Sequence, residues 1–247
     1  MPTLSTPPTI QGIAWKPGLQ AIKDSAMFSS FDEFREHLQH NTRQNSEETR
    51  KKYASLIISR LFPEKSLDGI NPKTWRFYRD EAMLEDLARV TTLETEMVIS
   101  RFLLEQVMVL PPGAFIDNTT LQDYVSSVYG VYKRDSYSRL RQAVIQMGFA
   151  SSEKKGLLVQ PVPMPNNAFM VFLHVRFAPT PRIVRLSDIL GAAFWKLMGI
   201  RDDITVRSIL RDANAKGLIA KYTVVDQLEQ ITTRYSCDEY LTEAFRL

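Results

Sequence analysis

Cysteine, histidine and glycine are all scarce in this chain. Its 247 residues include one cysteine, Cys237, and three histidines. A single thiol cannot build an internal disulfide framework or a multi-thiolate metal site, so the sequence excludes both classes of protein. With 10 glycines, it also lacks a glycine-rich phosphate loop, a dinucleotide-binding fingerprint and a Gly-x-Ser-x-Gly nucleophile motif. We therefore expect no cofactor.

Long apolar runs are missing too. The best stretches, 189–200 and 169–177, are interrupted by Lys196 and by His174 with Arg176. A membrane-spanning helix needs roughly 18 or more uninterrupted apolar residues. The first eight residues have neither the basic nor the apolar region of a secretion signal. We expect a cytoplasmic protein with no membrane partner.

What is present is an ordinary globular composition. Hydrophobic residues make up 44% of the chain and charged residues 24%, with a formal net charge of +3 and a pI near 8.9. A chain of this length can bury a substantial core distributed over two or three small modules. The small net charge decides nothing about partners, so any nucleic-acid hypothesis depends on where the positive charges lie.

The distribution of prolines and turn signals divides the chain into four parts. Residues 1–20 hold four of the 13 prolines and predict an extended arm. Residues 21–110 predict a helical domain. Residues 111–180 predict a winged-helix-like domain, and 181–247 a second winged-helix-like or helical domain. The fold class is thus mainly α with small β-hairpins, a helical N-terminal bundle being followed by winged-helix-like modules.

Helix-start signals support the N-terminal bundle. Ser30 with Glu33 forms a capping-box pattern, and Asn45-Ser46 precedes a second helix that ends near Phe62-Pro63. Asn71-Pro72 begins a third helix, which we expect to continue through Leu87. Thr91 with Glu94 predicts the cap of a fourth helix, and Pro111-Pro112-Gly113 predicts its end.

The second half predicts a different order of elements, in which short helices alternate with β-hairpins. Helices are predicted over 120–129 and 135–147, followed by Gly148 and a hairpin over 149–162 whose turn is Glu153-Lys154-Lys155-Gly156. Helix, turn, helix, hairpin is the winged-helix order. The apolar run 169–177 predicts a further strand.

A related order recurs nearer the C-terminus. Helices are predicted over 187–198 and 206–216, a hairpin from 218–225 and 230–235, and a last short helix over 238–245. The identities shared with the preceding segment are too few for a sequence repeat, so two winged-helix-like modules are a hypothesis.

Positive charge is concentrated in two places. Residues 131–155 hold six basic and two acidic side chains, at the start of the predicted recognition helix, along it and at the wing turn. In a winged helix these places meet the major groove and neighbouring phosphates. A second run contains Arg43 and four basic residues of the predicted second helix, Arg50, Lys51, Lys52 and Arg60, against Glu47 and Glu48. The candidate DNA-binding residues are Lys133, Arg134, Ser136, Tyr137, Arg139, Arg141, Lys154, Lys155, Arg50, Lys51 and Lys52.

Catalytic and metal-binding patterns are weaker. His37 and His40 lie one helical turn apart, a spacing suited to a metal but equally to a solvated helix face. Glu153-Lys154-Lys155 matches the Glu-x-Lys element of metal-dependent nucleases, yet it falls in the predicted wing turn without a well-placed upstream aspartate. We therefore expect a protein that is not an enzyme and holds no metal.

Two short regions carry a family resemblance. Asn45-Ser46-x-x-Thr49, with the following Ile58-Ser59-Arg60-Leu61, resembles the NusB-like BrxA family of BREX phage-defence islands. Ser136-Tyr137-Ser138-Arg139-Leu140, ending at Met147-Gly148-Phe149, resembles a second region of that family. The first twenty residues and the segment after about 165 match nothing in it.

The resemblance implies a small helical, non-enzymatic DNA-binding component of a bacterial antiviral defence system, with other subunits of that system as partners. The leading hypothesis from the residues agrees on double-stranded DNA. Two alternatives stay open: a protein-interaction adaptor in a multisubunit complex, and a winged-helix transcription regulator that uses the same helix-turn-helix surface.

Overall fold

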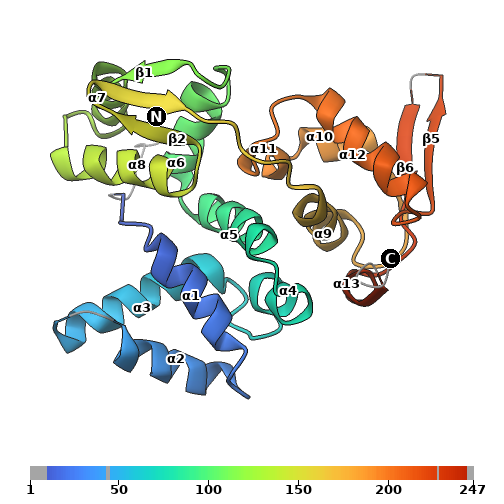
Figure 1. The fold of residues 1–247 in the computed structure, drawn as a ribbon, viewed down its shortest axis with the longest axis horizontal. Coiled ribbons are helices and arrows are strands. Elements are labelled where there is room, and N and C mark those ends of the chain that lie inside the picture. The colour runs from blue at the N-terminus through green and yellow to red at the C-terminus, as the bar shows by residue number, and fades with distance from the viewer. Residues whose placement is uncertain (1–9, 43–44, 227, 244–247) are drawn as a thin grey trace, which may run out of the picture.

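The computed structural model describes residues 10–42, 45–226 and 228–243. It is mainly helical, with two small antiparallel three-stranded sheets, and confirms the predicted fold class. Figure 1 shows a helical bundle, a first sheet-containing module beside it and a second one at the other end of the molecule. Among the helices described, none combines the length and apolarity needed to cross a bilayer.

Five helices build most of the N-terminal part. They are α1 (Trp15–Ser25), α2 (Phe31–Asn41), α3 (Glu47–Leu61), α4 (Ile70–Tyr78) and α5 (Glu81–Thr95). Two predicted caps are confirmed: the Ser30 hydroxyl accepts from the Glu33 amide and the Ser46 hydroxyl from the Thr49 amide, each at 3.2 Å. These hydrogen bonds satisfy amides that have no partner within their own helix.

The predicted extended arm is wrong for its last part. Residues 1–9 lie outside the description, but α1 begins at Trp15 and Ile10, Ile13 and Trp15 are buried. Pro17, which suggested an irregular segment, occupies the first turn of α1, where a missing amide costs nothing. The apolar side chains of this segment pack into the core and fix its position, which the number of prolines in the segment did not indicate.

Two predicted helix boundaries also move. Arg79 adopts a left-handed conformation with φ of 51°, and Asp80 accepts from the Met83 amide at 3.1 Å, so the expected long third helix divides into α4 and α5. Thr91 is not a cap: it is buried inside α5 and its hydroxyl donates to the Leu87 carbonyl at 3.2 Å. The next helix begins at Met97.

The first module has the order helix, strand, helix, helix, strand, strand. Its elements are α6 (Met97–Phe102) continued by the π-helix η1 (Leu103–Val107), β1 (Phe115–Asp117), α7 (Asn118–Tyr129), α8 (Arg134–Gln146), β2 (Ala150–Glu153) and β3 (Gly156–Val159). The sheet order is β1-β3-β2, all antiparallel. This is a winged-helix-like arrangement, with α8 in the recognition position and β2–β3 as the wing.

The second module has the same order with one additional short helix between its first strand and its hairpin. Its elements are α9 (Asn166–Phe177), β4 (Ile183–Arg185), α10 (Leu186–Gly191), α11 (Phe194–Leu197), α12 (Asp203–Ala215), β5 (Lys221–Val225) and β6 (Leu228–Thr232), followed by α13 (Cys237–Glu243). The sheet order β4-β6-β5 matches that of the first module. The hairpin and the last helix were predicted, although residues 244–245 of that helix lie outside the description.

The apolar run 169–177 forms a helix rather than the expected strand. Residues 168–174 are buried without a break, and α9 contacts both α5 and α13. A helix that is covered on all sides loses the period of 3.6 that distinguishes it from a buried strand. The predicted helix 187–198 likewise divides into α10 and α11.

Tertiary contacts place the module boundaries at different residues from those expected. Phe102 of α6 lies 5.0 Å from Tyr124 of α7, ring to ring, and the Tyr124 hydroxyl donates to the Val98 carbonyl at 2.8 Å. The helix before residue 110 therefore packs as part of the first module. In the same way Phe169 and Phe172 of α9 stack on Phe194, which joins α9 to the second module.

Candidate nucleic-acid interface

Helix α8, predicted as the recognition helix, has clearly different faces. Leu140, Ala143 and Val144 are buried against the module core. Arg134, Ser138 and Gln142 are exposed, and their spacing of four residues places them in one row along the helix. This row is open to another molecule, and Asp135 and Gln146 are exposed on α8 as well.

Arg141 lies beside this row and joins α8 to the wing. Its Nη2 donates to the Ser152 hydroxyl at 2.7 Å and to the carbonyls of Glu153 and Gly156 at 3.1 and 3.2 Å. All three acceptors are neutral, so they orient the guanidinium without cancelling its charge. The result is a positive group held between helix and wing.

The wing turn adds two more positive groups. Lys154 and Lys155 are exposed at the turn between β2 and β3, and the Lys155 carbonyl accepts from the Asn118 amide at 2.9 Å. Gly156 allows this close approach: a Cβ there would lie 2.0 Å from the Ile116 carbonyl oxygen. The turn is therefore held against the start of α7.

A polar cleft of about 370 Å³ separates α8 from the wing. The Tyr137 hydroxyl donates to the Asn118 Oδ1 at 2.8 Å across it. The lining residues are Asn118, Tyr137, Ser138, Arg141, Gln142 and Lys154. With two cations and several neutral donors, this lining suits an anion such as a phosphodiester.

Lys133 and Arg134 begin α8. The Lys133 ammonium lies 4.5 Å from the centre of the Tyr129 ring, a cation–π contact that leaves its charge in place. Arg134 is exposed in the first turn. Both predicted residues thus lie at the same end of the cleft-bearing helix.

Two predicted contact residues point elsewhere. Ser136 is fully buried, and its hydroxyl has no hydrogen-bond partner within the described chain, so it cannot contact a ligand on the surface. Arg139 donates to the Ile10 carbonyl at 2.8 Å, where it ties the N-terminal segment to α8. The Ile10 amide in turn donates to the Tyr129 hydroxyl at 3.2 Å. Both residues are structural.

The second basic run does not join this surface. Arg50, Lys51 and Lys52 lie on α3 of the bundle, and Arg43 lies outside the described residues. Lys51 pairs with Glu47 at 2.7 Å and Lys52 with Glu48 at 2.6 Å, each one turn away. These contacts lower the pKa of both carboxyl groups, so the pairs stay ionised and cancel much of the local positive charge.

The described residues place no set of metal ligands around either of the two weak catalytic patterns, His37 with His40 and Glu153-Lys154-Lys155. The His37 ring lies 4.8 Å from that of Phe28, and its Nδ1 is 3.1 Å from the Asn41 amide nitrogen. No cluster of three or more His, Cys, Asp or Glu side chains that could hold a metal occurs in residues 10–42, 45–226 and 228–243. Glu153 lies in β2 at the wing turn.

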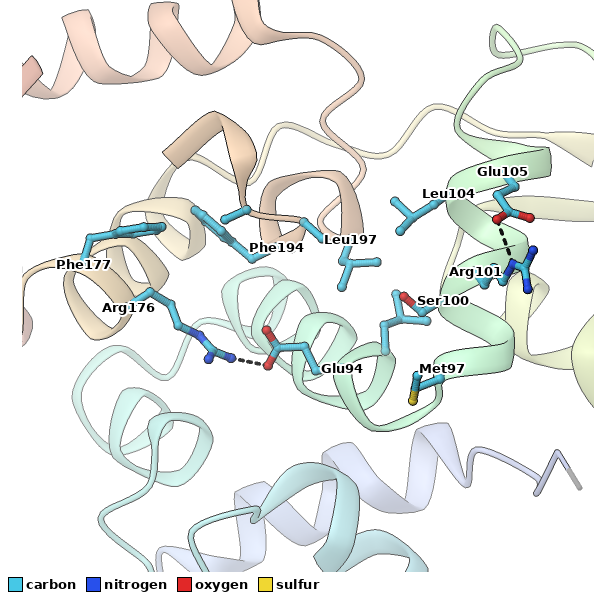
Figure 2. A pocket seen from close by; sticks show the side chains of 13 residues that line it. Glu94, Met97, Ser100, Arg101, Leu104, Glu105, Arg176, Phe177, Phe194 and Leu197 are labelled. Carbon is cyan, nitrogen blue, oxygen red and sulfur yellow. Dashed lines mark hydrogen bonds and ion pairs between the residues drawn. The ribbon is translucent and has the colours of Figure 1, made fainter. Parts of the chain in front are cut away.

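A larger cavity lies elsewhere. It occupies about 560 Å³ between α5–α6–η1 and α9–α11, with Phe194, Leu197 and Leu104 on its walls, as Figure 2 shows. Glu94 pairs with Arg176 at one side and Arg101 with Glu105 at the other. Because its charges are paired, this groove offers no net charge for a phosphate.

Two residues of the cleft, Gln142 and Asn118, were not singled out in the sequence. Gln142 could have been found, because it continues the four-residue row from Arg134 and Ser138 along a helix that was predicted correctly. Asn118 could not, because only the pairing of β1 with β3 brings the start of α7 beside the wing turn.

Comparisons with protein-family models, curated proteins and solved structures give no match to this chain. A function is therefore inferred from the geometry of the first module.

Proposed function

We propose that this protein binds double-stranded DNA through α8 and the β2–β3 wing of its first module. One observation carries the proposal: Arg141 and Lys154 line a polar cleft between α8 and the wing, and the contacts of Arg141 are to neutral acceptors. Exposed Lys155 follows Lys154 in the wing turn, and exposed Arg134 lies one helical turn before Ser138 of the cleft. Cations that have no acidic partner bind a phosphate backbone most strongly.

The arrangement divides the contacts into two kinds. The row Arg134, Ser138 and Gln142 faces the base edges when α8 enters the major groove, where Arg suits guanine and Gln suits adenine. Arg141, Lys154 and Lys155 meet the phosphates of the strand that passes between helix and wing. Lys133 and Tyr137 add contacts at the ends of the cleft.

The test is the salt dependence of binding to a random-sequence duplex. The variant Lys154→Ala/Lys155→Ala should lower the slope of log K against log salt by ~2, since each phosphate contact contributes ~0.9 to it. The variant Lys51→Ala/Lys52→Ala is the control, because those lysines are paired on α3, and its slope should not change. Absence of binding at low salt, or an unchanged slope in the wing variant, removes the proposal.

The wider role is a separate proposal. The resemblance to the BrxA family suggests a non-enzymatic accessory component of a bacterial phage-defence system, and a transcription regulator would use the same DNA-binding surface. Loss of phage protection on deletion, with restoration by the wild-type chain but not by Lys154→Ala/Lys155→Ala, supports the defence role. Unchanged phage sensitivity contradicts it.

A further inference from the structure

The second module repeats the topology of the first but not the chemistry of its helix–wing face. α12 occupies the position of α8, and β5–β6 that of β2–β3. Where the first wing turn has Lys154-Lys155, the sequence between β5 and β6 reads Asp226-Gln227. A surface of equivalent position therefore has the opposite charge at its tip.

The arginine of the second face is neutralised. Arg207 donates to both carboxylate oxygens of Glu229 on β6, at 2.9 and 3.1 Å, and to Asp203 at 2.5 Å. Tyr222 also donates to Glu229. Arg141 of the first module, by contrast, contacts only neutral acceptors of its wing. A phosphate approaching α12 would meet two carboxylates around one guanidinium, an arrangement that disfavours DNA.

Arg211 keeps its charge, but it lies beside Tyr222 at the base of the second wing and not at its tip. Its guanidinium lies 5.7 Å from the centre of the Tyr222 ring, and Lys216 pairs with Asp212 at 2.8 Å. Lys221 is exposed at the base of the wing, away from the tip. The tip and the start of α12 carry Asp226, Asp202 and Asp203.

Apolar side chains are exposed among these acids. Ile204, Val224, Val225 and Leu228 are each between 49% and 74% exposed. Val224 pairs across the hairpin with Glu229, and Glu229 contacts Arg207 one turn from Ile204. We call this combination of α12 start and wing tip the acidic-apolar face. Exposed apolar groups bordered by charge mark protein-interaction sites rather than DNA contacts.

We propose that the acidic-apolar face docks a segment of another protein that presents apolar side chains flanked by lysine or arginine. The apolar residues exclude water from the contact, and the exposed Asp202 and Asp226 select the positive flanks by charge complementarity. Binding of this segment does not require the first module to bind DNA, so the inference is independent of the proposed function.

The test is a selection, from a displayed random-peptide library, of the peptides that bind the whole chain. Enriched peptides should combine apolar anchors with net positive charge. Their affinity should fall about tenfold or more for Ile204→Ser/Val224→Ser, as for central interface residues. Asp226→Asn should further weaken the binding of the basic peptides. Met97→Ser is the control, because Met97 is exposed on α6, outside the face, and it should change nothing.

Three outcomes overturn the proposal: enriched peptides that are acidic, peptides whose binding survives Ile204→Ser/Val224→Ser, and a chain that self-associates through these residues, which would make a second copy the occupant. The same variant should bind duplex DNA with unchanged affinity and salt slope. A loss there would place nucleic acid on this face, whereas a failure of wild-type DNA binding would affect only the proposed function.

Discussion

At the scale of single residues, the environment of a side chain decides its role more than its type does. Arg139 and Arg141 are two residues apart on α8 and are identical in chemistry. One binds the Ile10 carbonyl of the N-terminal segment, and the other binds the wing. The two guanidiniums point to different sides of the helix, so only Arg141 belongs to the cleft.

This difference predicts separable effects of two substitutions. Arg139→Ala should lower the free energy of unfolding by ~1–3 kcal/mol, because a buried carbonyl loses a charged donor, and should leave DNA affinity unchanged. Arg141→Ala should weaken DNA binding. Chemical denaturation and salt-titrated binding measure both quantities. Weaker DNA binding by Arg139→Ala without loss of stability would contradict the assignment.

His174 gives a second prediction, in pH. Burial lowers its pKa from 6.5 to about 4, against the raising effect of its contact with the Met170 carbonyl, and its ring stacks 4.0 Å from Tyr240. The folded state therefore holds the neutral ring, while the unfolded state takes up a proton below its ordinary pKa. The contribution of His174 to the free energy of unfolding is fully present above pH 6.5. It falls by up to ~3 kcal/mol as the pH drops toward 4.

The measurement is urea denaturation across this pH range. His174→Phe retains an aromatic ring beside Tyr240 and removes the titrating group, so it should be less sensitive to acid than the wild type. Equal acid sensitivity of the two chains would show that other groups cause the loss.

At the scale of elements, the first wing depends on a glycine. Gly156 begins β3, and a Cβ there would lie 2.0 Å from the Ile116 carbonyl and 2.9 Å from the Asp117 Cα, both backbone atoms of β1 that cannot move independently. The same β1–β3 pairing brings Asn118 to the wing turn.

Gly156→Ala should therefore destabilise the protein by ~1–3 kcal/mol, the usual range for overpacking, and weaken DNA binding by displacing the wing. Thermal unfolding and duplex binding measure the two effects. Gly191→Ala is the matched control, since a Cβ there meets nothing within 4 Å. Equal melting temperatures for the two variants would mean that the β1–β3 approach is not essential.

At the scale of the whole molecule, one continuous core joins the bundle and both modules. Arg60 of α3 is fully buried and binds Glu96 and the Gly12 carbonyl. Arg89 of α5 donates to the Met147 carbonyl of the first module at 2.9 Å, and Lys73 of α4 pairs with Asp238 of α13. Helix α5 lies at the centre, in contact with α3 and α9 (Figure 1).

This continuity predicts a single cooperative unfolding transition. Trp15 and Trp75 report on the bundle and Trp195 on the second module. Two variants are compared, one that retains Trp195 as its single tryptophan and one in which only Trp195 is replaced. In each variant, the urea midpoint measured by fluorescence should equal the midpoint measured by circular dichroism. Separate fluorescence and circular-dichroism transitions within one chain would show that the modules unfold independently.

Much of this protein was determined by its sequence alone. Hydrophobic periodicity and the caps at Ser30 and Ser46 act locally, so they predicted helices, and the lysine pair between two short apolar strands predicted the first wing. The mainly helical fold class and three of the residues that line the cleft, Tyr137, Arg141 and Lys154, followed from these local patterns.

The tertiary structure decided what depends on contacts between distant residues. Complete burial made α9 a helix, because the core that covers it on every side removes the pattern by which it could be recognised. Packing turned Ser136 inward and Arg139 toward Ile10, and strand pairing brought Asn118 to the wing. The different chemistry of two topologically equal modules is likewise tertiary, since Arg207 is neutralised by Glu229, 22 residues further along the chain.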